Sequence, residues 1–110
     1  ITGKAPTLIR PPYGAYNSRV KKLSKLPLVL WTVDPLDWKT HSTSATVRRV
    51  LNSARRNSVV LMHDIHPSTQ RAVPTIVRKL IDRGYRLVTV SQLRGGDLKP
   101  GRLYYPLYKN

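Results

Sequence analysis

The chain has 110 residues and no cysteine, and 20 Lys and Arg side chains stand against five Asp, which gives a formal net charge of +15. This length fits one domain with a modest core, the lack of cysteine excludes disulfides and thiolate metal sites, and no apolar run approaches the roughly 20 residues of a membrane span. The charge favours polyanionic partners without choosing among nucleic acid, anionic lipid and acidic cell-wall polymers, and its even spread is typical of solvated helix faces.

The N-terminal third predicts a strand, a helix and a second strand. Residues 7–10 and 28–33 are short apolar runs rich in β-branched side chains, as in strands buried on both faces. Between them, Asn17 can cap a helix over the stretch "SRVKKLSK". Because the chain starts at Ile1, without Met or a leader, we expect it to be a piece of a longer protein.

The middle of the chain predicts a second helix and a third strand. Ser42 or Thr43 can cap this helix, and Asn57 can stop it. One face of the helix carries apolar side chains at helical spacing: Val47, Val50, Leu51 and Ala54. Residues 58–62 then form another buried strand.

The last third predicts a third helix and a fourth strand. The helix places Pro74 in or near its first turn and ends at Gly84. Its apolar face consists of Val73, Ile76, Val77, Leu80 and Ile81. Residues 86–90 follow as a strand, whereas the tail after Leu93 has no usable periodicity. We therefore divide the chain into a folded part, 1–93, and a tail, 94–110.

This alternation predicts parallel strands joined by right-handed crossover helices. Loops at the carboxyl ends of such strands gather on one face, where ligands bind. Here those loops are "RPPYGAY", "DPLDWKT" and "HDIHPST", and they hold Arg10, three of the aspartates and two of the three histidines. The loops at the opposite end are chemically plain. Each polar loop alone could be structural, but together they resemble half of an active site.

The stretches "RPPYG", "DPLDW" and "LMHDIH" resemble the third, fourth and fifth motifs of polysaccharide deacetylases, the NodB-homology domains of carbohydrate esterase family 4. The resemblance extends from about Thr7 to Leu93. It implies an α/β fold, the C-terminal half of a deformed (β/α) barrel. It also implies metal-dependent removal of acetyl groups from an extracellular polysaccharide, with a zinc-bound water as nucleophile.

The family's aspartate pair and its histidine motif, which supply the catalytic base and the metal ligands, are absent from this sequence. The resemblance therefore implies that zinc is bound by a missing N-terminal half, present as a second chain or a nicked fragment. His41 is read as a loop residue. The rival interpretation is a metal site within this chain, built on the spacing of His63 and His66.

Carried over by motif, His63 would be the general acid, and Asp37 would favour its protonated form. Arg10 would hold the catalytic-base aspartate of the missing segment through a charge-assisted pair. These three residues form the expected catalytic group.

Three further residues would bind the acetyl group of the substrate. Tyr13 would contribute its backbone N–H to the oxyanion hole, while Trp38 and Leu61 would wall the methyl pocket. Asp34 is expected to shape its loop, and Asp64 and His66 to fix theirs.

The sequence thus predicts a secreted or envelope-associated deacetylase acting on N-acetylglucosamine of peptidoglycan, because a basic segment is drawn to an anionic wall. Chitin and acetylated xylan remain alternative substrates. A basic polyanion- or nucleic-acid-binding module accounts for the charge, but it leaves the one-sided Arg, Asp and His unexplained, so no nucleic acid is expected. A catalytically dead, carbohydrate-binding relative is the other alternative.

Overall fold

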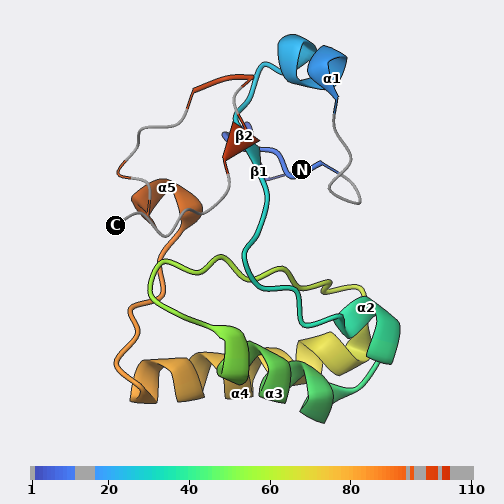
Figure 1. Cartoon of the computed structure of the whole chain (residues 1–110), viewed down its shortest axis with the longest axis vertical. Coiled ribbons are helices and arrows are strands. Elements are labelled where there is room, and N and C mark those ends of the chain that lie inside the picture. Colours follow the sequence, from blue (N-terminus) through green and yellow to red (C-terminus); the bar gives the residue numbers. More distant parts are fainter. Residues whose placement is uncertain (1, 12–16, 94, 96–98, 102, 105–110) are drawn as a thin grey trace.

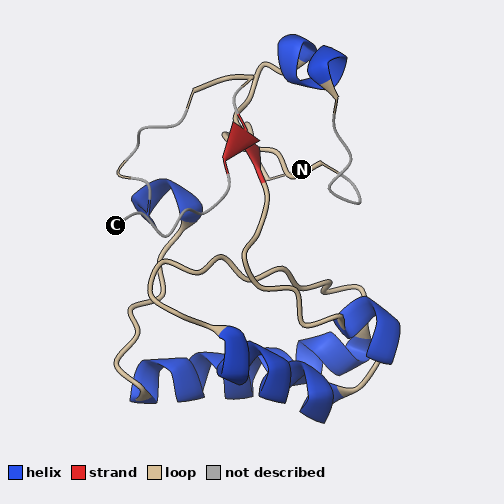
Figure 2. Cartoon of the chain, in the orientation of Figure 1, coloured by secondary structure: helices blue, strands red, loops and turns tan. Residues whose placement is uncertain are grey.

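The computed structural model describes residues 2–11, 17–93, 95, 99–101, 103 and 104. Figures 1 and 2 show a layer of helices at one end of the molecule and a short pair of strands toward the other. In chain order the elements are α1 (Ser18–Leu23), β1 (Leu28–Val29), α2 (Asp37–Thr40), α3 (Thr43–Ser53), α4 (Pro67–Asp82), α5 (Val90–Leu93) and β2 (Leu103–Tyr104). No helix within the described part is long and apolar enough to cross a membrane.

Parallel pairing of the first three predicted strands is confirmed, although the paired stretches are short. Ile9 bridges Leu28, and Val33 bridges Val60, both in parallel. The β1 strand also pairs with β2 in parallel, so that the tail contributes a strand that its sequence did not indicate. The backbone N–H groups of Leu30 and Thr32 donate hydrogen bonds to the carbonyls of Tyr104 and Val59, at 3.0 and 2.9 Å respectively. Segments 28–33 and 58–62 thus run side by side, and their ends lie together.

The predicted strand at 86–90 is wrong for the described structure. Leu87 and Val88 are 46% and 39% exposed and make no backbone hydrogen bond with any other described residue, and α5 begins at Val90. An apolar, β-branched run becomes a strand only where a neighbouring strand accepts its backbone hydrogen bonds. The described part of the chain offers this run no such neighbour.

The helix predictions hold for the caps and fail for three boundaries, the first of which is the end of α1 at Leu23 rather than at Lys25. Asn17 caps α1 by accepting the N–H of Val20, and Ser42 caps α3 by accepting that of Ala45. However, α3 ends at Ser53, before Asn57. Pro74 lies inside α4 rather than in its first turn, because Pro67 occupies that turn.

Helices α3 and α4 pack on each other to form the main core. Its buried members are Val50, Leu51, Ala54, Ala72, Ile76 and Leu80, with Val60 and Met62 of the third predicted strand packed against them. The prediction for the apolar face of α4 was wrong at Val77 and Ile81, which are 36% and 54% exposed. Because Val60 and Met62 pack against these helices, the core fixes the position of the backbone at residue 63.

Candidate active site

The centre of the candidate site is a pair formed by His63 and Asp37. His63 Nδ1 lies 2.9 Å from Asp37 Oδ1, and the backbone N–H of His63 donates to Asp37 Oδ2 at 2.7 Å. The hydroxyl of Thr69, in the first turn of α4, donates to the same Oδ2 at 2.7 Å. The carboxylate thus fixes both the backbone and the ring of His63, and leaves Nε2 as the ring nitrogen available to a ligand.

Asp37 is fully buried, at 0% exposure, and yet carries a carboxylate. Burial alone would raise its pKa, because it disfavours the charged form. The hydrogen bonds from the His63 backbone, the Thr69 hydroxyl and the His63 ring outweigh that effect, and the pKa of Asp37 falls below its ordinary value. A carboxylate that stays ionised accepts a charge-assisted hydrogen bond from the backbone N–H of His63 and contacts the ring of the same residue.

Local backbone geometry turns Asp37 toward His63. Leu36 has a left-handed backbone with φ of 57° at the start of α2, an uncommon conformation for a residue with a side chain. Asp34 stabilises this turn by accepting the N–H of Leu36 at 2.9 Å. The hydrogen bond supports the interpretation of Asp34 as a loop-shaping residue, although its side chain also reaches the cavity.

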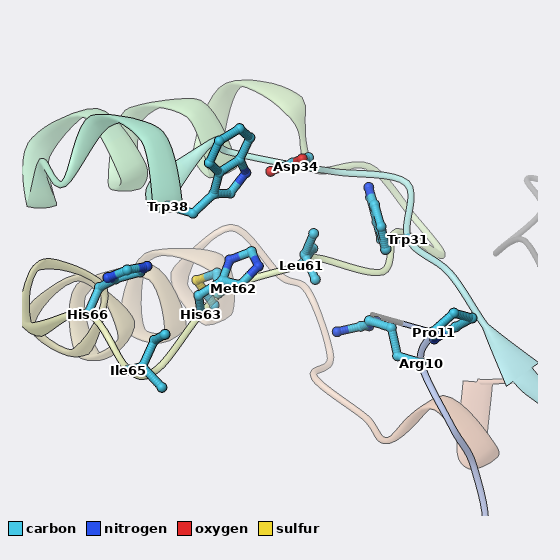
Figure 3. A pocket seen from close by; sticks show the side chains of 10 residues that line it. All are labelled: Arg10, Pro11, Trp31, Asp34, Trp38, Leu61, Met62, His63, Ile65 and His66. Atoms are coloured by element: carbon cyan, nitrogen blue, oxygen red, sulfur yellow. The ribbon is translucent and has the colours of Figure 1, made fainter. Parts of the chain in front are cut away.

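The side chain of His63 is 35% exposed and faces a cavity of about 700 Å³ (Figure 3). The lining residues come from three of the predicted loops and strand ends: Arg10, Pro11, Trp31, Asp34, Trp38, Leu61, Met62, His63, Ile65 and His66. Four of the six expected site residues therefore share one cavity. Asp37 does not line it but supports His63 from the protein side. Tyr13 lies outside the described residues.

Arg10 lies at the opposite end of the cavity from His66 (Figure 3). Its guanidinium carbon is 5.9 Å from the centre of the Trp31 ring, within cation–π range. Burial lowers the pKa of Arg10, and no carboxylate of the described residues forms an ion pair with it. A guanidinium placed in this way can donate hydrogen bonds to a carboxylate that another segment or chain brings into the cavity.

His41, His63 and His66 approach one another without forming a metal site. The ring centres of His41 and His66 are 4.5 Å apart, with the rings edge to face, and the ring centres of His63 and His66 are 6.3 Å apart. Among the described residues no three His, Cys, Asp or Glu side chains are arranged to hold a metal ion. These residues therefore do not fit the metal that the family resemblance implies.

Sequence reasoning missed Thr69 and Trp31. Thr69 is a first-turn residue of α4, and its distance from Asp37 along the chain hides their contact. Trp31 lies in a predicted strand, where an aromatic residue is ordinary. Only the parallel pairing of residues 28–33 with the strand before it brings Trp31 beside Arg10.

Comparison with known proteins places the chain in a family. No protein-family model matches the chain. The peptidoglycan-N-acetylmuramic acid deacetylase PdaC of Bacillus subtilis is 46% identical over 93 residues, which cover 84% of this chain and 20% of PdaC. The peptidoglycan-N-acetylglucosamine deacetylase PgdA of Listeria monocytogenes is 41% identical over 104 residues, covering 94% and 22% of the two chains.

Among solved structures, a T48 deacetylase with substrate is 52% identical and superimposes with a TM-score of 0.88 over 94% of this chain. The family 4 acetyl xylan esterase of Clostridium thermocellum, solved with a cobalt ion, is 27% identical with a TM-score of 0.82 over 93% of the chain. The chain spans about a fifth of PdaC and PgdA and 52% and 54% of these two solved chains. It belongs to the polysaccharide deacetylases of carbohydrate esterase family 4, and corresponds to the C-terminal half of their deformed barrel.

Proposed function

We propose that the complete protein is a metal-dependent peptidoglycan deacetylase that removes N-acetyl groups from N-acetylglucosamine. The observation that carries this proposal is the histidine that follows segment 58–62, held by a fully buried carboxylate and facing a cavity. The two peptidoglycan deacetylases named above support this substrate class. A nucleic-acid-binding module would need neither the pair nor the cavity.

In this proposal His63 is the general acid. As the C–N bond of the acetamide breaks and the oxygen of water bonds to the acetyl carbon, Nε2 of His63 delivers its proton to the departing amine. Asp37 is the positioning residue: its contact with Nδ1 favours the charged, proton-bearing ring. Activation of the attacking water falls to the N-terminal half.

Trp38 and Leu61 form the wall of the acetyl pocket in this proposal, and Tyr13 completes the oxyanion hole with its backbone N–H. Leu61 is 7% exposed, and Trp38 is 46% exposed beside the same cavity. A small apolar surface next to the general acid suits the methyl group of an acetamide. Arg10 would take the catalytic-base aspartate of the N-terminal half in a charge-assisted pair.

The N-terminal half of the same domain is the proposed partner, as a second chain or a nicked fragment, and it would hold the metal, which we take to be zinc. The exposed segment around Leu87 and Val88 supports this partner. Both side chains are exposed, and their backbone groups make no hydrogen bond in the described part of the chain. A strand from the missing half of the barrel would satisfy those groups.

We further propose a secreted or envelope-associated location. A net charge of +15 would hold such a domain near an anionic cell wall. Peptidoglycan lies in that wall, so the location and the proposed substrate agree.

The test is acetate release by the complete domain, zinc-loaded, from peptidoglycan, chitin oligomers and acetylated xylan. Mass spectrometry of the digested peptidoglycan should locate new free amines on N-acetylglucosamine residues. Free amines on muramic acid alone would refute the proposed sugar. Release from xylan or chitin but not from peptidoglycan would refute the proposed polymer.

A further inference from the structure

The contact between Arg10 and Trp31 has no counterpart in the roles assigned so far. The guanidinium carbon lies 5.9 Å from the centre of the indole ring, and both side chains line the cavity (Figure 3). Arg10 comes from the first predicted strand and Trp31 from within the second. Leu61 separates this pair from Trp38 and His63 in the same view.

Both partners in this contact stand on fixed backbone. Ile9, just before Arg10, donates its N–H to segment 27–29 at 3.0 Å and accepts one from it at 2.8 Å. Leu30 and Thr32, on either side of Trp31, donate their N–H groups to neighbouring segments at 3.0 and 2.9 Å. The indole is therefore a rigid surface, whereas the guanidinium ends a long side chain that needs support.

The charge of Arg10 also needs support. The pKa of its guanidinium is lowered by burial, and no described carboxylate pairs with it. An aromatic face attracts a partly desolvated cation and leaves the N–H groups at its edge free for hydrogen bonds. A carboxylate in a bidentate pair with Arg10 would instead occupy the N–H groups that a second carboxylate needs.

We propose that Trp31 is a positioning residue for Arg10, holding the guanidinium against the cavity wall so that it can take the catalytic-base carboxylate. This inference rests on the proposed function, because the carboxylate belongs to the missing half. It assigns Trp31 a role in turnover rather than in sugar binding.

The test compares Trp31→Leu with Trp31→Phe in the complete zinc-loaded domain. Leu keeps apolar bulk but removes the aromatic face, so kcat should fall by about threefold to thirtyfold with KM unchanged. Phe keeps a face and should retain most of the activity. In an Arg10→Met background, Trp31→Leu should cause no further loss, since the cation that it positions is gone.

Three kinetic results would overturn the proposal. A rise in KM at constant kcat would make Trp31 a sugar platform. Equal losses in Trp31→Leu and Trp31→Phe would indicate packing alone. Independent, multiplying losses from Arg10→Met and Trp31→Leu would show that the two residues do not act together.

A readout that needs no turnover separates this inference from the proposed function. In the NMR spectrum of the complete domain, the ring of Trp31 should shift the Arg10 side-chain signals upfield, and Trp31→Leu should abolish that shift. If the wild-type domain releases no acetate but the shift is present, the proposed function fails and the contact stands. If Trp31→Leu leaves the Arg10 signals in place, the contact itself is refuted.

Discussion

Replacing Asp37 with asparagine is the most informative single change, because it keeps the shape of the side chain and removes its charge. Asp37 is fully buried and accepts three hydrogen bonds, two from His63 and one from Thr69. An amide offers one oxygen. If that oxygen keeps the two bonds at the Oδ2 position, the NH₂ group must face Nδ1 of His63.

The magnitude follows from these contacts. One acceptor is lost and the remaining bonds are no longer charge-assisted, so the complete domain should lose about 1–3 kcal/mol of unfolding free energy. An NH₂ group facing Nδ1 makes that nitrogen an acceptor, which places the proton on Nε2 of a neutral ring and withdraws support from the imidazolium. Turnover should then fall by about 10²- to 10⁴-fold.

Denaturant unfolding and acetate release of the complete domain measure both effects. Asp34→Asn is the matched control: Asp34 lines the same cavity, and the hydrogen bond that it accepts from the Leu36 N–H survives the change to an amide. If Asp37→Asn retained wild-type turnover while folding normally, the role given to the carboxylate would be wrong.

The lowered pKa of Asp37 adds a pH dependence to this comparison. Above an ordinary aspartate pKa of about 3.9, Asp37 is ionised in both the folded and the unfolded state, and its contribution is complete. As the pH falls below the pKa of the unfolded state, the unfolded state binds a proton before the folded state does. The contribution of Asp37 to stability is therefore lost as the pH falls through the lower pKa of the folded state. The stability difference between wild type and Asp37→Asn should therefore be constant above about pH 5 and shrink below pH 4.

Two further predictions concern the isolated chain. Purified residues 1–110 should bind zinc poorly, because the described residues offer no three-ligand set; isothermal titration calorimetry showing one tightly held zinc ion per chain would restore the His63 and His66 site. The chain alone should also lack a sharp cooperative melt in circular dichroism and should associate with its N-terminal half, burying well over the roughly 1,600 Å² of a standard interface. A stable monomer in analytical ultracentrifugation with a cooperative melt would contradict this half-barrel account.

The sequence predicted those parts of the fold that depend on neighbouring residues. The caps at Asn17 and Ser42 need only a side chain that reaches a nearby N–H, and both were found. The start of α4 depended on a choice between two prolines. Pro74 matched the start of the apolar pattern, but Pro67 occupies the first turn, and Pro74 lies inside the helix at an exposed position.

The parts that depend on distant partners were not predictable in this way. Residues 103–104 have a neighbouring strand to pair with, whereas residues 86–90 have none in the described part of the chain. An apolar run in the sequence does not indicate whether such a neighbour is present. The site shows the same division. The chemistry of His63 was evident from its place after a strand, whereas the contacts of Thr69 and Trp31 arise from packing between segments far apart in the chain.

In the proposed mechanism His63 is the general acid of a deacetylase whose metal ligands lie outside this chain. The most direct test of this role is His63→Ala in the complete domain, with acetate release and bound metal measured on the same preparation. We expect turnover to fall by about 10²- to 10⁴-fold while the metal content stays at the wild-type level. Unchanged turnover, or loss of the metal together with the activity, would contradict it.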